Sequence, residues 1–164
     1  MIKSRNSLIK NATIKKMQIA ENKKAFFDYE ILETLETGIV LSGAETKSSK
    51  MGQVSLRGAY VTNINNLLYL TGAHISPYQP ANQPVDYNPT RPRSLLLKKK
   101  ELKYFLGKLK EKGLTLIPLR MYTKQNLVKL EIGLAKGKKK YDKREQIKKR
   151  EDNRRIGRSL KGEE

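Results

Sequence analysis

The chain of 164 residues contains no cysteine and no tryptophan, and His74 is its only histidine. The absence of cysteine excludes disulfides, a thiolate nucleophile and any cysteine-based zinc site, and it suits a reducing cytoplasmic environment. His74 follows a strand-like run, and no serine or cysteine nucleophile can be placed beside it, so we interpret it as a packing or hydrogen-bonding residue. A glycine-rich phosphate loop is also missing, and no cofactor is expected.

Long apolar runs are missing as well. No segment approaches the ~20 apolar residues that span a bilayer, so we expect no membrane-spanning helix. The first 20 residues contain four lysines, one arginine and no acid, but no apolar stretch follows as in a secretory signal. We expect residues 1–21 to form a flexible basic arm, and an organellar transit peptide is the less favoured alternative.

Acidic residues are scarce, with 16 Asp and Glu against 35 Lys and Arg, which gives a formal net charge of +19. The excess is spread along the chain, so we expect a large polyanionic partner. Nucleic acid is the favoured one, because each phosphate neutralised by lysine or arginine releases condensed counterions. An anionic membrane surface fits less well, because the basic C-terminal segment lacks the apolar face of an interfacial helix.

Residues 136–164 form that segment, with 13 basic and 6 acidic residues and few large aliphatic ones. Such a segment cannot bury enough apolar surface to offset the entropy of ordering it, so we expect a tail that is disordered until bound. Tyr141 has no core to join there, and its ring could stack on an unpaired base.

Strand patterns dominate the middle of the chain, which we delimit as residues 22–135. Strands are predicted at 26–35, 38–41, 60–64, 67–70, 114–122 and 127–135, with turns at Asn65-Asn66 and at 124–126. Helices are predicted at 44–51 and over the apolar stripe of Leu102, Phe105, Leu106 and Leu109. The fold class is therefore mainly β with helices, a small closed six-stranded barrel flanked by two to three helices.

The acidic residues near the first strand raise the question of catalysis. Asp28 and Glu30 would share one strand face by period two, which is conceivable as a metal-dependent nuclease dyad. A solvated strand face is the favoured interpretation, because such a site needs further ligands in fixed geometry. We therefore predict neither an enzyme nor a metal site.

Several motifs occur in collinear order between about residues 20 and 160. They are Asn22-Lys23-Lys24-Ala25, Glu36-Thr37-Gly38, Gly43-Ala44-Glu45-Thr46-Lys47-Ser48, Pro89-Thr90-Arg91-Pro92-Arg93, and Glu131-Ile132-Gly133-Leu134-Ala135-Lys136-Gly137-Lys138-Lys139 with Asp142-Lys143-Arg144. On these motifs the chain resembles the tmRNA-binding small protein B family.

The resemblance implies an oligonucleotide-binding-like (OB-like) barrel and a non-enzymatic, cytoplasmic factor of ribosome rescue. Such a factor binds the tRNA-like domain of tmRNA, one protein to one RNA, in place of a missing anticodon arm. The alanine-charged RNA, carried by elongation factor Tu, then enters the A site of a stalled ribosome. The tail would lie as a helix in the empty mRNA channel, coupling its folding to the absence of message.

The resemblance also implies site residues. RNA contacts would fall on Asn22, Lys23, Lys24, Glu36, Arg91, Leu96, Lys98 and Lys99. The decoding-centre segment would comprise Lys138, Lys139, Tyr141, Asp142, Lys143 and Arg144. Lys98 stands where the family usually has Asn or His, which favours a phosphate contact over base-edge recognition. Asn88 replaces the family's usual Asp, and Ser48-Ser49-Lys50 replaces Ser-Leu-Arg.

Two other functions remain open at this point. A generic OB-like translation or nucleoid protein would bind any folded nucleic acid by charge, with affinity set by salt. A metal nuclease using Asp28 and Glu30 would cleave RNA in a Mg²⁺-dependent manner.

Overall fold

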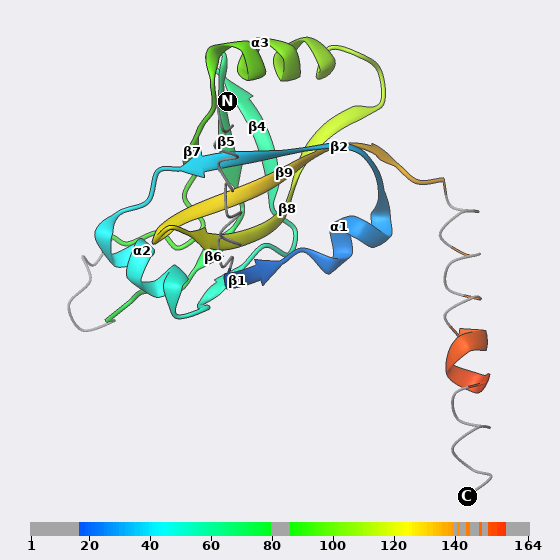
Figure 1. Cartoon of the computed structure of the whole chain (residues 1–164), viewed down its shortest axis with the longest axis horizontal. Coiled ribbons are helices and arrows are strands. Elements are labelled where there is room, and N and C mark those ends of the chain that lie inside the picture. The colour runs from blue at the N-terminus through cyan, green and yellow to red at the C-terminus, as the bar shows by residue number, and fades with distance from the viewer. Residues whose placement is uncertain are drawn as a thin grey trace, which may run out of the picture.

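The computed structural model describes residues 17–79, 86–139, 141, 144, 148 and 151–156. The fold is mainly β with several helices (Figure 1). In chain order the elements are β1 (Met17–Glu21), α1 (Lys23–Asp28), β2 (Tyr29–Ile39), α2 (Gly43–Lys50), β3 (Val54–Ser55), β4 (Tyr60–Ile64), β5 (Leu67–Thr71), β6 (His74–Ile75), β7 (Arg93–Leu96), α3 (Lys99–Lys108), β8 (Leu114–Lys124) and β9 (Leu127–Gly137).

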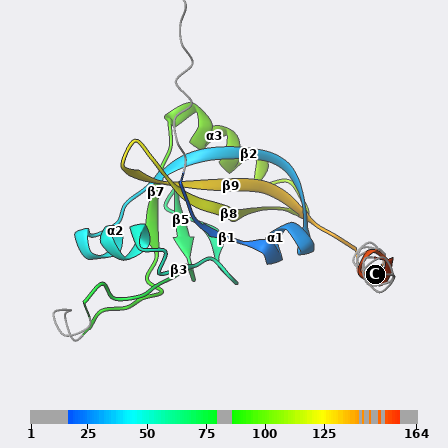
Figure 2. The ribbon, with the colours of Figure 1, turned by 60° about the horizontal axis from the view of Figure 1, so that its bottom comes forward.

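The strands form a seven-stranded antiparallel sheet in the order β1-β8-β9-β2-β7-β5-β4, and β3 pairs with β6 separately. Figure 2 shows β2, β9 and β8 side by side as one arched layer. The prediction of a closed six-stranded barrel was wrong, because the sheet is not closed. Within the described residues β1 pairs only with β8 and β4 only with β5, so the hydrogen-bond ladder ends at both strands instead of joining them.

Both predicted hairpins are confirmed. Asn65 and Asn66 have φ of 51° and 60°, and Gln125 and Asn126 have φ of 51° and 62°. Two consecutive residues with positive φ form the turn whose twist matches that of antiparallel strands, and asparagine tolerates this conformation best after glycine. These turns set the register of β4 with β5 and of β8 with β9.

The main core lies on one face of the sheet. The stripe predicted for the helix packs there: Phe105 is buried, and Leu102, Leu106 and Leu109 lie against the same cluster as Leu116 and Leu134. The predicted helix at 44–51 is also present as α2, capped by Ser42.

A second, smaller cluster covers part of the opposite face. Ala25 of α1 packs with Ile117, Leu119 and Ala135. Leu116 and Ile117 are adjacent in β8 but belong to different clusters, as expected where alternate residues face opposite sides. The sequence prediction of a strand from residue 26 was wrong for its first part, because residues 26–28 complete α1, which packs on the sheet.

The tail was predicted to be disordered, which the structure does not confirm. The described tail residues, namely 141, 144, 148 and 151–156, are helical and exposed. Residues 1–16 and 80–85 lie outside the described residues, while Met17–Glu21, which was assigned to the N-terminal arm, forms β1. None of the helices in the described part of the chain has the length and apolar character needed to cross a membrane.

Candidate nucleic-acid interface

Beyond α1, the outer face of the sheet carries a polar network centred on Glu36. The phenol of Tyr122 donates a hydrogen bond of 2.6 Å to Glu36 Oε2. The Lys124 ammonium lies 2.9 Å from Oε1 and 3.1 Å from Oε2 of the same carboxylate. Burial, together with the hydrogen bond and the negative charge of Glu36, raises the pKa of Tyr122 well above its usual value, so the phenol keeps its proton.

Register places Leu96 on the same face. Tyr122 lies opposite Lys129, Lys129 opposite Gly38, and Gly38 opposite Leu96. Paired residues in adjacent strands point to one side of a sheet, so this row crosses four strands on the outer face. A Cβ on Gly38 would lie 3.1 Å from the Cβ of Leu96. Glycine at this position leaves room for Leu96, whose exposed fraction of 59% is large for a leucine.

Lys98 and Lys99 extend this region at the start of α3, and both are exposed. The backbone N–H of Lys98 donates to Glu101 Oε2 at 3.0 Å, so the carboxylate satisfies one free donor of the helix N-terminus. The Lys98 ammonium plays no part in that cap. Glu36 in β2, Leu96 in the adjacent strand β7, and Lys98 and Lys99 at the start of α3 therefore lie on neighbouring elements.

Asn22 has a different environment, because its side chain is buried. Its Oδ1 accepts from the Ala25 N–H at 3.1 Å and caps α1, while its Nδ2 donates to the Pro118 carbonyl at 3.1 Å. The Asn22 N–H also donates to the Leu119 carbonyl. Asn22 thus fastens α1 to the irregular part of β8, where the register shifts between Pro118 and Arg120.

Lys23 and Lys24 follow Asn22 and are exposed. They line a hollow of about 460 Å³ together with Arg57 and residues of β1 and β3. This basic hollow is separate from the Glu36 network, so the residues predicted to contact RNA are distributed over more than one surface.

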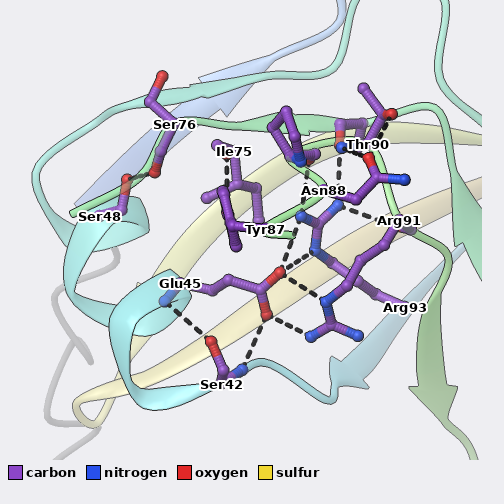
Figure 3. Close-up of polar contacts among 12 residues, drawn as sticks. Ser42, Glu45, Ser48, Ile75, Ser76, Tyr87, Asn88, Thr90, Arg91 and Arg93 are labelled. Carbon is purple, nitrogen blue, oxygen red and sulfur yellow. Dashed lines mark hydrogen bonds and ion pairs between the residues drawn. The ribbon is translucent and has the colours of Figure 1, made fainter. Parts of the chain in front are cut away.

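Arg91 belongs to an ion cluster built on the buried side chains of Glu45 and Arg93, which holds residues 89–91 before β7 (Figure 3). Its guanidinium binds both carboxylate oxygens of Glu45, and Arg93 donates from Nε to Glu45 Oε1 at 2.9 Å. Arg93, which is fully buried, also donates to the carbonyls of Ala73, Pro89 and Arg91.

Glu45 is ionised within this cluster. Burial alone would raise its pKa, but hydrogen bonds from Arg91 and the Ser42 backbone, together with Arg93, hold the pKa below its ordinary value. The Glu45 N–H in turn donates to Ser42 Oγ, so the same residue closes a capping box on α2. The cluster connects α2 to the start of β7, the strand that carries Leu96.

The tail leaves the sheet beside α1. The Lys138 N–H donates to the Asp28 carbonyl and its ammonium donates to the Phe26 carbonyl, both at 3.0 Å. Lys139, Tyr141 and Arg144 are exposed, with Tyr141 exposed by 75%. Asp142 and Lys143 lie outside the described residues. These two hydrogen bonds fasten Lys138 to the body of the protein.

Comparison with known proteins decides the family. A family model described as "SmpB protein" matches residues 19–162. The chain belongs to the SmpB protein family. It is 50% identical over 143 residues to an "SsrA-binding protein" of Carboxydothermus hydrogenoformans, covering 87% of this chain and 95% of that protein. It is 49% identical to an "SsrA-binding protein" of Trichodesmium erythraeum, covering 87% and 92%.

A solved structure described as "tmRNA-SmpB: a journey to the center of the bacterial ribosome" is similar to the chain with a TM-score of 0.61 and 45% identity. The match covers 73% of this chain and 84% of that one. At 45% identity the two chains are similar in sequence as well as in fold.

The sequence did not predict that Tyr122 and Lys124 would bind Glu36. It also did not predict the ion cluster of Glu45 and Arg93. The i, i+2 spacing of Tyr122 and Lys124 places them on one strand face, which was a usable signal. The idea that Asp28 and Glu30 share a strand face was wrong, because Asp28 ends α1 and Glu30 lies in β2. The described residues hold no cluster of three potential metal ligands.

Proposed function

We propose that the chain is a non-enzymatic RNA-binding factor of trans-translation. It binds the tRNA-like domain of tmRNA in place of a missing anticodon arm, and it brings alanyl-tmRNA with elongation factor Tu to the A site of stalled ribosomes in the cytoplasm. The observation that carries this proposal is membership of the SmpB family over residues 19–162. The net charge of +19 agrees with two RNA partners, tmRNA and the ribosome.

The work is divided between two parts of the chain. Residues 22–135 bind tmRNA as a monomer, and residues 136–164 enter the empty mRNA channel as a helix. The helical, exposed residues of the described tail support this division, as does the anchoring of Lys138 beside α1. The exposed ring of Tyr141 is suited to stacking on a base of the decoding centre.

Within the body, the exposed residues Leu96, Lys98 and Lys99 offer an apolar contact and two ammonium groups to the RNA. Asn22 and Arg91 act by positioning, because their side chains bind groups of the protein itself. Lys23 and Lys24 supply a second basic surface.

A binding titration tests the proposal. The full-length protein is titrated against the tRNA-like domain of tmRNA and against an ordinary tRNA at several salt concentrations. We expect a preference of ~10²-fold or more for the tRNA-like domain that persists as salt rises, because structure is read in addition to phosphate. Equal affinities that fall together with salt would instead indicate a generic basic protein that binds by charge.

A further inference from the structure

The carboxylate of Glu36 is engaged by side chains of the protein itself, while the side chain remains 31% exposed. Both of its carboxylate oxygens lie within 3.1 Å of the Lys124 ammonium, and Oε2 also accepts from Tyr122. The carboxylate is thus directed at two side chains of β8 across the intervening strand β9. A negative charge at this place would repel RNA phosphates unless the neighbouring cations outweigh it.

Lys124 has the properties of the group that meets the RNA. Its ammonium has three N–H donors, and the two oxygens of Glu36 engage at most two of them. The Lys124 side chain is 28% exposed, so the ion pair with Glu36 holds it in place at the surface. A lysine fixed by a carboxylate loses less side-chain entropy on binding than a mobile one.

The surroundings favour a phosphate as the group that Lys124 binds. Lys129 lies opposite Tyr122 and Gly38, and Leu96 follows in the next strand, so the row carries cationic and apolar groups. Three inter-strand spacings of about 4.8 Å make this row about 14 Å long, enough to follow a short stretch of RNA backbone. Glu131, the acid opposite Glu36, lies 4.0 Å from Arg120, which also forms a 3.1 Å ion pair with Glu21.

We infer that Lys124 contacts a phosphate of the bound RNA, and that Glu36 and Tyr122 are positioning residues that orient its ammonium. The inference rests on the proposed function and assigns to Glu36 a role different from direct RNA contact. Glu36 then supports RNA binding although its charge alone opposes it. Tyr122 fixes the carboxylate from the other side, and its high pKa keeps the phenol a donor.

The salt dependence of binding separates the two roles. A phosphate contact contributes about 0.7–0.9 to the slope of log affinity against log salt. If Lys124 makes such a contact, Lys124→Met lowers affinity and reduces the slope by about this amount. The advantage of the wild type should shrink about threefold between about 50 and 200 mM salt. Glu36→Ala should also reduce the affinity and the salt slope, because it releases the Lys124 ammonium from its fixed position.

The experiment measures binding of the full-length protein to the tRNA-like domain for the wild type, Lys124→Met, Glu36→Ala and the double variant. We expect the double variant to match Lys124→Met, because Glu36 acts through Lys124. Tyr122→Phe should weaken binding less and leave the slope nearly unchanged. Lys108→Met is the matched control, since Lys108, the last residue of α3, forms an ion pair of the same 2.9 Å length with Glu111, which follows the helix.

Two results would overturn the inference. One is that Lys124→Met binds like Lys108→Met with an unchanged slope. The other is that Glu36→Ala weakens binding equally with and without Lys124, as a direct contact of Glu36 with RNA would. Neither result affects the preference of the wild type for the tRNA-like domain over tRNA. That preference tests the proposed function separately. Urea unfolding of each variant shows whether a loss of binding follows from a loss of fold.

Discussion

At the scale of single residues, the polar side chains of this protein divide into those that hold the fold and those left for a partner. Asn22 uses its amide to cap α1 and to bind the Pro118 carbonyl. A family pattern alone would count it as an RNA contact, but burial and two hydrogen bonds give it a structural task. Leu96 is the opposite case. Its place in an apolar run suggests a core residue, but its side chain is exposed and left for a partner.

Glu45 is the residue on which acid stability should depend. Its pKa in the folded protein lies below the ordinary value of 4.5, because Arg91, the Ser42 backbone and Arg93 outweigh the effect of burial. Ionised Glu45 therefore stabilises the fold at pH above about 4.5, and this contribution is lost as the pH falls through the lower folded pKa. We expect Glu45→Gln to reduce the free energy of unfolding at pH 7 by about 3 kcal/mol, because two arginines lose their buried partner.

Urea unfolding of the wild type and Glu45→Gln between about pH 3 and 7 tests this expectation. The difference between the two proteins should narrow as the pH falls below 4.5. Glu111→Gln, which breaks an exposed ion pair, is the control and should change stability little at any pH. A difference that stays constant over the whole range would show that ionisation of Glu45 is not what stabilises the cluster. If Glu45→Gln does not fold, Arg91→Met provides a milder break, since Arg91 is 40% exposed.

At the scale of elements, α1 depends on the shape of the strands beneath it. Gly133 of β9 lies under Leu119 and Ile31, two side chains of the cluster that receives α1. A Cβ at Gly133 would lie 2.9 Å from Leu119 Cδ1 and 3.2 Å from Ile31 Cγ2. The glycine in this motif therefore has a packing reason that does not involve RNA.

Substitution of this glycine should loosen the contact between α1 and the sheet. We expect Gly133→Ala to destabilise the fold by about 1–2 kcal/mol, because an added methyl group overpacks the cluster. Gly137→Ala in the same strand is the matched control, since a Cβ there meets nothing within 4 Å. The urea midpoints of both variants decide the matter, and equal midpoints would mean that Leu119 moves aside without cost.

At the scale of the whole molecule, the excess positive charge is spread over the N-terminal segment, the body and the tail. Lys138 marks the border between body and tail, because it still donates hydrogen bonds to the carbonyls of Phe26 and Asp28 in α1. A chain that ends after Lys139 keeps this border intact and loses only residues 140–164. It also loses 10 basic and 6 acidic residues, a net charge of +4.

We expect this truncated chain to bind the tRNA-like domain with affinity within a few-fold of the wild type and to fail in tagging on stalled ribosomes. This expectation follows from the proposed division, in which the body reads tmRNA and the tail senses the empty mRNA channel. A binding titration and an in vitro tagging assay measure the two properties on the same protein, with a chain ending after Lys136 for comparison. A large loss of tmRNA affinity in the chain ending after Lys139 would contradict the division into two parts.

Much of the local structure could be predicted from the sequence. The turn at Asn65-Asn66 and the stripe of α3 are confirmed, because both follow from short-range conformational preference and period. The aromatic and aliphatic run at 26–35 was partly misassigned, since local preference favours a strand throughout. Packing of Ala25 and Phe26 on the sheet, together with the Asn22 cap, makes its beginning a helix instead.

The charge, the hairpins, the amphipathic helix and the motifs that identify the family can all be read from the sequence, because each depends on composition or on neighbours within a few positions. The open sheet and the contacts of Glu45 with Arg91 and Arg93, and of Glu36 with Tyr122 and Lys124, arise only in the folded chain. These partners are separated by 46, 48, 86 and 88 positions along the chain. Contacts at such separations exist only once the strands are in register, so no local pattern specifies them.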